Sequence, residues 1–290
     1  MKHGDFVQKL KLKRTFMAIE EKDYEDLKQA VVCLEYPSFI SKITSFLEKP
    51  VGKIIDNLPV QASQNIQDAV KITLKNLLTL TVKTMDKEFK QEASTTTHKI
   101  ASGISGALGG AFGLPALAIE LPISTSIILR SIADIARSEG EDITTLQARL
   151  ACLEIFALGG KSDTDDGAET GYFAVRAVLA KAVSDAAKHI AVKGLTEKGA
   201  PPIVRLITQL ASRFGTVVSE KVFVQGVPVI GALGGATINL LFVDHFQEVA
   251  RGHFIVRRLE RKYGKEEVKE KYMKILSEYM KNSSGSRGRQ

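Results

Sequence analysis

The chain has 290 residues, of which 44% are hydrophobic and 25% charged, and its net charge is +7. This composition excludes an intrinsically disordered chain, and the length allows one large domain or two small ones. The two cysteines, Cys33 and Cys152, have apolar neighbours and indicate core residues in a reducing compartment, and the scattered charges of the first 16 residues predict no secretory signal.

Apolar residues recur at helical spacing along the chain, and sustained strand-like alternation is missing. In chain order, the expected helices contain Leu27–Leu34, Phe39–Leu47, Ala62–Phe89, Leu146–Ala157, Glu169–Lys193, a segment opened by Pro201, and Val268–Tyr279. Gly159 and Gly160 form a typical C-terminal stop for the fourth of these. We therefore predict an all-α fold with a single multi-helical domain over residues 1–281 and a disordered basic tail over 282–290.

The positive charge is concentrated at the C-terminal end. The last 40 residues carry 12 Lys and Arg against five Glu, whereas the first 250 are neutral. A basic end of this kind suits an anionic membrane surface, and a solvated basic face is the plainer alternative. The residues expected to contact a membrane or another anion are Arg257, Arg258, Arg261, Lys262, Lys265 and Lys269.

The pentapeptide GALGG occurs twice, at Gly106–Gly110 and Gly231–Gly235, each time within an uncharged stretch. Neither copy has the preceding strand and following lysine of a phosphate-binding loop. Proline and polar residues interrupt both stretches, which disfavours stable membrane spanning. Glycines four residues apart share one face of a helix, where another backbone can approach closely. We therefore expect glycine-rich central helices that pack tightly.

Polar residues within or just after these stretches form a candidate functional cluster: Glu120, Arg130, Asp134, Asn239, Asp244 and His245. Arg130 and Asp134 are four residues apart, and Glu120 precedes Arg130 by about three helical turns, so the three are expected to share a face and to pair. Their isoleucine neighbours predict partial burial. A structural ion pair is the favoured interpretation, and a functional cluster is the alternative.

Three short segments resemble known functional motifs, but each lacks a residue that its motif requires. Gly160-Lys161-Ser162 lacks the first P-loop glycine, because Ile155 stands there. The acidic segment from Asp163 has Gly167 where a calcium loop needs a ligand, which leaves adventitious Ca²⁺ as a minor alternative. Ala107 replaces the second glycine of a nucleophile elbow. We therefore predict no catalytic residues, no cofactor and no metal site.

Two blocks of the sequence contain distinctive motifs. Gly113–Asp142 contains Gly-Leu-Pro, an acidic residue before a second proline, Leu-Arg-x-Ile-x-x-Ile-Ala and Gly-x-Asp. Val227–Gly264 contains Pro-x-x-Gly-Ala, then Asn, His-Phe and Leu-Glu-x-x-Tyr-Gly. Both blocks resemble the EcsC family, and the resemblance covers nearly the whole chain. It implies a relation to a protein encoded beside an ABC transporter, and a peptidase label that some members carry, but no established biochemical function.

These observations lead us to expect a non-enzymatic binding protein of bacterial type. It would be cytoplasmic and held peripherally at the inner face of a membrane, with an anionic membrane surface or a membrane protein such as a transporter as its partner. We expect no specific nucleic-acid binding, and homo-oligomer formation is left open. The alternatives are a peptidase-like hydrolase that uses the polar cluster in a helical cleft, or an adaptor in a transporter or toxin system.

Overall fold

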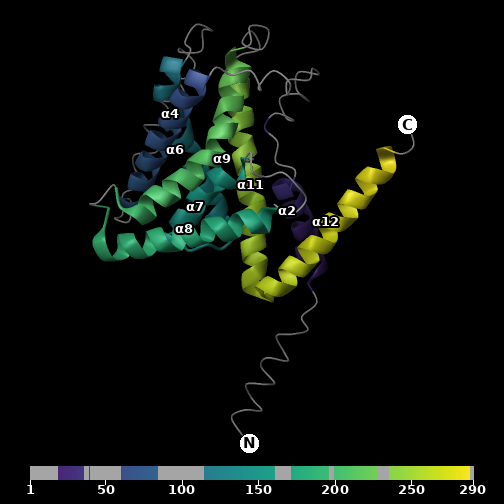
Figure 1. Cartoon of the computed structure of the whole chain (residues 1–290). Coiled ribbons are helices and arrows are strands. Elements are labelled where there is room, and N and C mark those ends of the chain that lie inside the picture. The colour runs from purple at the N-terminus through teal and green to yellow at the C-terminus, as the bar shows by residue number, and fades with distance from the viewer. Residues whose placement is uncertain are drawn as a thin grey trace, which may run out of the picture. The chain divides into compact units, whose positions relative to one another are not determined.

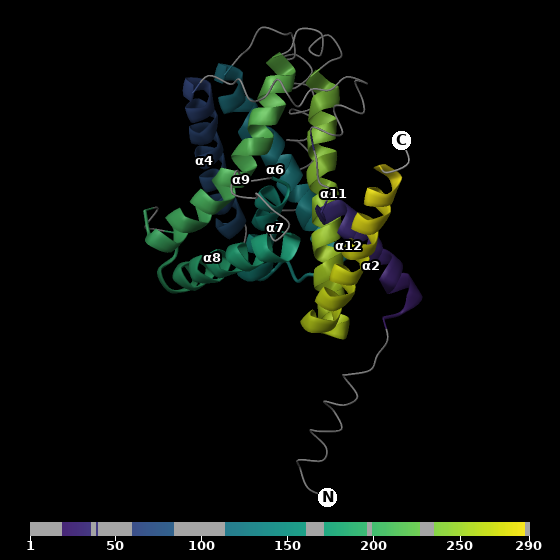
Figure 2. The same cartoon turned by 45° about the vertical axis from the view of Figure 1, so that its right-hand side comes forward.

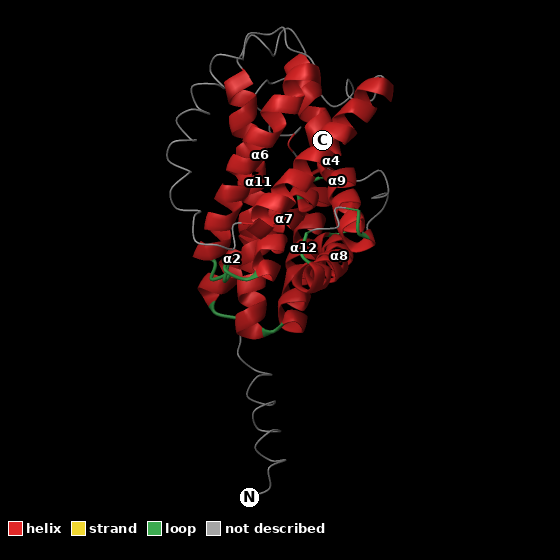
Figure 3. Ribbon diagram, turned by 90° about the vertical axis from the view of Figure 1, so that its left-hand side faces the viewer, coloured by secondary structure: helices red, strands yellow, loops and turns green. Residues whose placement is uncertain are grey.

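The structure, a computed structural model, describes residues 19–35, 39, 60–83, 114–160, 171–195, 199–226 and 235–287. Within these ranges every regular element is a helix (Figure 3), which confirms the all-α prediction. The helices are α2 (Glu21–Glu35), α4 (Val60–Lys83), α6 (Leu114–Ser138), α7 (Leu146–Leu158), α8 (Tyr172–Lys193), α9 (Pro201–Gly226), α11 (Gly235–Tyr263) and α12 (Lys265–Arg287).

The chain divides into two compact units, and α11 contributes residues to both. Unit 1 consists of Met1–Tyr36 and Arg251–Gln290, and unit 2 of Pro37–Ala250. That residues 1–281 make a single domain stays a prediction.

Unit 2 is built around α7. In Figures 1 and 2, α4, α6 and α9 lie side by side and α8 runs across their lower end. Every residue of α7 from Leu150 to Leu158 is buried. A helix that is apolar on nearly every side has to be covered on all sides, and the run LACLEIFAL has one charged residue, Glu154, which is itself buried. The apolar run therefore places α7 in the centre of the unit.

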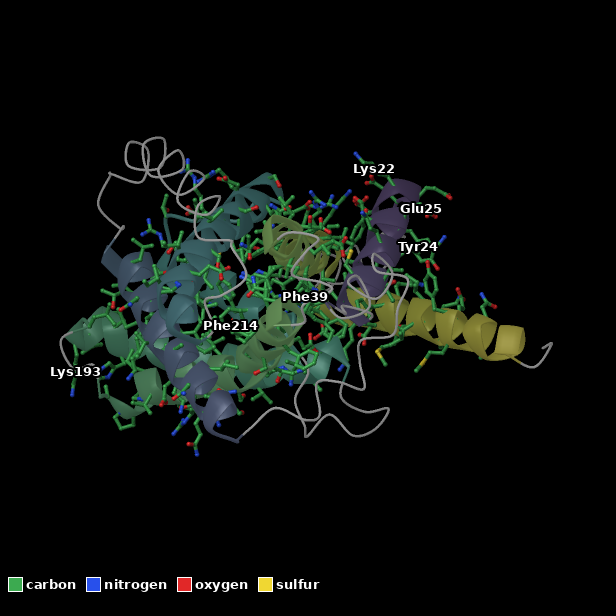
Figure 4. The ribbon with its side chains drawn as sticks, turned by 90° about the horizontal axis from the view of Figure 1, so that it is seen from above. Lys22, Tyr24, Glu25, Phe39, Lys193 and Phe214 are labelled. Carbon is green, nitrogen blue, oxygen red and sulfur yellow. The ribbon has the colours of Figure 1, made fainter. Side chains whose placement is uncertain are left out.

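An aromatic cluster fills the core of unit 2. The ring centroids of Phe156 and Phe214 are 4.9 Å apart, and those of Phe242 and Phe246 are 5.2 Å apart. Phe39 adds an edge-to-face contact with Phe242 at 5.5 Å. Figure 4 shows Phe39 and Phe214 inside the unit. Such pairs contribute about 0.5–1.5 kcal/mol each beyond the burial of their surface.

The stop after α7 brings two backbones into close contact. Gly159 caps the helix, as the sequence predicts, and its carbonyl oxygen lies 2.8 Å from Nε2 of His245. A Cβ atom on Gly160 would overlap the backbone carbonyl group of Arg213 on α9. Gly160 is therefore required by the packing of α9 against the end of α7.

We expect Gly160→Ala to lower the free energy of unfolding by ~1–3 kcal/mol, because a backbone carbonyl cannot swing aside as a side-chain tip can. The measurement is chemical denaturation of the full chain. Gly199→Ala is the matched control, since an added Cβ there meets no described atom within 4 Å. Equal denaturation midpoints for the two variants would contradict the close approach.

Unit 1 contains α2, α12 and the C-terminal part of α11. The predicted stripe on α2 is confirmed, because Leu27, Val31 and Leu34 are buried. Gly264 separates α11 from α12 at a φ of 98°, a conformation that favours glycine. The hydroxyl of buried Tyr272 on α12 donates a hydrogen bond of 2.8 Å to Glu35 on α2. Apolar stripes and this bond together hold α12 against α2.

Other predicted segments lie only partly within the residues that the structure describes. Phe39 is described and helical, but the rest of Phe39–Leu47, the GALGG copy at Gly106–Gly110, and the second copy before Gly235 lie outside the described residues. The tail prediction is wrong for residues 282–287, because α12 continues to Arg287. A helix that has already formed gains further residues at low cost, so weak helix formers at its end do not stop it.

Among the described residues, no helix combines the length and the apolar character needed to cross a membrane.

Candidate functional site

Among the described residues of unit 2, the most deeply buried charge is an ammonium group. Lys221 on α9 has no exposed surface, and its Nζ donates a hydrogen bond of 2.6 Å to Oε1 of Glu120 on α6. The same Nζ lies 4.5 Å from the ring centroid of Phe242 on α11. Three helices thus meet at this cation: α9 carries the lysine, α6 the carboxylate and α11 the aromatic ring.

The electrostatics of this pair are dominated by burial. Removal of Lys221 from water lowers the pKa of its ammonium group, and the neighbouring Glu120 carboxylate opposes that change only in part. The side chain of Glu120 keeps 22% of its surface exposed. Because the anion is partly solvated and the cation is not, the carboxylate mainly offsets the cost of burying Lys221.

A second polar group lies near the same part of α11. The side-chain amide of Asn239, one turn before Phe242, has its nitrogen and its oxygen buried without a hydrogen-bond partner among the described residues. An unsatisfied buried amide costs free energy, so Asn239 is a candidate to bind a further group.

The other two predicted site residues on α11 are Asp244 and His245. Their side chains point in different directions, as expected for adjacent positions on a helix. Asp244 is exposed, whereas His245 is buried in the aromatic cluster. Since a carbonyl oxygen only accepts, the contact with Gly159 places the ring proton of His245 on Nε2. No group of three potential metal-ligating side chains occurs in the part of the chain that the structure describes.

The predicted pairing on α6 is wrong. Asp134 pairs with Arg137 at 2.7 Å, and both side chains are more than half exposed. Glu120 pairs with Lys221 of another helix and not with Arg130. Ile128 and Ile132 are buried, and the period of the helix turns Arg130 and Asp134 away from that face. The predicted partial burial is therefore correct for Glu120 and Arg130, which are half-buried, and wrong for Asp134, and the three charges do not form one cluster.

Lys221 is not among the predicted site residues, although the sequence contains a signal for it. Phe214, Val217, Val218 and Val224 are all buried on α9. Lys221 lies three residues from Val218 and from Val224, within the same apolar stripe. A lysine in the middle of such a stripe predicts a buried cation that needs a partner.

Unit 1 holds a separate charged array centred on Asp23 of α2, which is 4% exposed. Asp23 accepts hydrogen bonds of 2.8 Å from Lys262 Nζ and 2.8 Å from Tyr263 Oη, and one of 3.2 Å from Arg258 Nη1, all on α11. Asp26 accepts a bond of 2.6 Å from Arg258 Nη2, and Glu20 one of 2.8 Å from Lys262. The acidic residues at the start of α2 thus pair with basic residues near the end of α11.

Burial alone would raise the pKa of the Asp23 carboxyl. The hydrogen bonds from Lys262 and Tyr263, with the positive charges of Lys262 and Arg258, outweigh burial and hold this pKa below its ordinary value. The hydrogen bond to Asp23 is the main reason that the pKa of Lys262 is raised, and Glu20 adds to it. Both shifts favour the ionised pair.

The six residues expected to contact an anion therefore have different surroundings. Arg258 and Lys262 form ion pairs with α2. Arg257 is half-buried, and Arg261, Lys265 and Lys269 are exposed. Their role at a membrane stays a prediction, and it falls mainly on the residues outside the Asp23 array.

In the part of the chain that the structure describes, these features define a helical protein with ion pairs centred on buried Lys221 in unit 2 and on buried Asp23 in unit 1. The chain belongs to the EcsC protein family, whose model matches residues 18–259. The match includes Glu120, Lys221 and Asp23, and it ends before α12 begins. The comparison with curated proteins gave no match, and the comparison with solved structures gave none either.

Proposed function

We propose that this protein acts by binding, and that it associates peripherally with an anionic membrane surface through α12. The observation that carries the proposal is that α12 exposes large apolar side chains and lysines together. Met273 and Met280 are each 49% exposed and Tyr279 is 38% exposed. Lys265, Lys269, Lys274 and Lys281 are exposed on the same helix.

Helical spacing brings these two kinds of side chain together. Met273 and Met280 are seven residues apart and share a face, and Lys269 precedes Met273 by four residues. An interfacial helix inserts flexible apolar side chains between lipids while its lysines meet the anionic headgroups. Each basic residue near such a surface contributes ~1 kcal/mol.

Acidic residues limit the strength of this attraction. Glu266, Glu270 and Glu278 are also exposed on α12, and Arg258 and Lys262 are already paired with α2. The net attraction is therefore modest. Binding of this kind weakens as salt screens the charges, since the Debye length falls from about 10 Å at 0.1 M to about 3 Å at 1 M ionic strength.

The test is sedimentation of the full chain with vesicles of neutral lipid and with vesicles containing phosphatidylserine. We expect binding to the anionic vesicles, and a loss of at least about tenfold in Lys265→Glu/Lys269→Glu/Lys274→Glu. Lys71→Glu/Lys75→Glu/Lys188→Glu is the control, because it makes the same change in net charge at exposed sites of unit 2. Met273→Ser/Met280→Ser should weaken binding without changing its salt dependence.

Equal binding to neutral and anionic vesicles would contradict the proposal. So would an equal loss in the two triple variants, since that result would assign the effect to net charge and not to α12.

A further inference from the structure

Unit 2 contains a pocket at the end of α4, where α6 and the start of α7 meet it. Its volume is about 100 Å³, and apolar side chains make most of its wall: Leu80, Leu129, Ala133 and Ile143. An apolar cavity of about 150 Å³ holds a benzene molecule, so this space suits a ligand with only a few carbon atoms. Drug-sized ligands need pockets of about 300 Å³ or more.

Two arginines, Arg137 and Arg149, line the same pocket. Arg149 Nε donates a 2.6 Å bond to the carbonyl oxygen of Ile143, and its Nη1 donates a 3.4 Å bond to that of Thr81. These bonds use two of its five N–H groups. No described carboxylate forms a salt bridge with Arg149, so its charge lies half-buried at the pocket without a counter-ion in the described part of the chain.

The wall contains one more polar group whose hydrogen-bonding capacity is unused. Thr81 is 6% exposed, and its hydroxyl oxygen is buried without a hydrogen-bond partner among the described residues. Arg137 is held at the pocket by its 2.7 Å contact with Asp134 on the preceding turn of α6. The pocket therefore combines an apolar wall, a positively charged side and an unpartnered hydroxyl.

We propose that this pocket binds a small carboxylate with a short apolar chain, of the size of butanoate to hexanoate. The chain would occupy the space between Leu80, Leu129 and Ile143, and the carboxylate would accept hydrogen bonds from Arg149 and Arg137. A planar carboxylate matches the forked donors of a guanidinium group, and the pair strengthens when it is partly removed from water. This site is independent of the membrane contact proposed for α12.

The proposal is tested by calorimetric titration of the full chain with straight-chain carboxylates of two to eight carbon atoms. We expect affinity to increase about fourfold per methylene group until the pocket is filled, and then to level off. Hexanol, which has the same chain without the charge, should bind at least about tenfold more weakly than hexanoate.

Variants locate the site. Ala133→Leu fills the pocket and should abolish hexanoate binding, and Arg149→Gln and Arg137→Gln should each weaken it about tenfold or more. Arg205→Gln is the matched control, because Arg205 is a similarly exposed arginine that pairs with Asp185 on another part of unit 2. If Arg149→Gln fails to fold because it loses its bonds to Ile143 and Thr81, Arg137→Gln and Ala133→Leu still decide the question.

Retention of wild-type affinity in Ala133→Leu would overturn the proposed location. Equal affinities for hexanoate and hexanol would overturn the role of the arginines, and the absence of heat with every carboxylate would overturn the site itself.

Discussion

Replacement of Glu120 by alanine should lower the free energy of unfolding by ~3–5 kcal/mol, the cost expected when one partner of a buried ion pair is removed. Lys221 has no exposed surface, and Glu120 holds its ammonium group at 2.6 Å. Without the carboxylate, the ammonium group has to remain buried as an uncompensated charge or lose its proton. Urea denaturation at pH 7 measures the difference.

Two further variants separate the ion pair from packing. Lys221→Met removes the buried cation and leaves a partly solvated carboxylate, so we expect a smaller loss than in Glu120→Ala. The double variant Glu120→Leu/Lys221→Met should be close to wild type in stability, because an apolar pair of similar volume replaces the ion pair. A double variant as unstable as Glu120→Ala would assign the loss to packing.

The loss in Glu120→Ala should also depend on pH. In the folded protein the pKa of Lys221 is lower than its ordinary value of 10.5, which applies to the unfolded chain. At a pH between the folded pKa and 10.5, Lys221 is therefore protonated more fully in the unfolded chain than in the folded protein. Stability from this group therefore rises with pH in that interval, and removal of Glu120 lowers the folded pKa further and widens the interval. The difference between wild type and Glu120→Ala should shrink as the pH increases from 7 to 10, and an unchanged difference would contradict a buried charge.

Asp23→Ala is expected to destabilise unit 1 by ~2–4 kcal/mol. The substitution removes three hydrogen bonds with Lys262, Tyr263 and Arg258 from a side chain that is 4% exposed. Bonds to charged groups contribute ~1.5–3 kcal/mol each, and partial solvation of both cations reduces the sum. Asp26→Ala is the control, because Asp26 is more exposed and pairs with Arg258 alone in the array, so we expect at most ~1 kcal/mol there.

Acid should remove this contribution. Because the folded pKa of Asp23 is lowered below the ordinary value of 3.8, its stabilising effect is fully present above about pH 4 and is lost as the pH falls through the folded pKa. Wild type and Asp23→Ala should therefore have increasingly similar free energies of unfolding as the pH falls below the folded pKa of Asp23. Parallel pH profiles down to pH 2 would show that Asp23 is not ionised in a favourable pair.

Helix positions could be predicted from the sequence because they depend on local spacing. Pro37 and the stripe Leu27–Leu34 define α2, and the double glycine at Gly159 marks the end of α7. The same spacing, applied to α6, would have placed Asp134 on the outer side and avoided the wrong pairing with Arg130. The ends of a helix and its buried face can be predicted in this way because both depend only on the spacing of residues within that helix.

Partners from distant parts of the chain could not be predicted in this way. Arg258 is 235 residues from Asp23, and Lys221 is 101 residues from Glu120. A lysine in an apolar stripe shows that a partner is needed, but not which of the 33 acidic residues supplies it. Likewise, the pocket at Arg149 combines the ends of three helices, and no single segment contains it.

Peripheral attachment to an anionic membrane is tested most directly by fractionation of cells that produce the full chain. We predict that the protein sediments with membranes at low ionic strength and is released by a wash at about 1 M salt, where charges are screened beyond about 3 Å. Lys265→Glu/Lys269→Glu/Lys274→Glu should stay in the supernatant throughout. Sedimentation that only detergent reverses, or a wild-type protein that never sediments, would contradict the proposal.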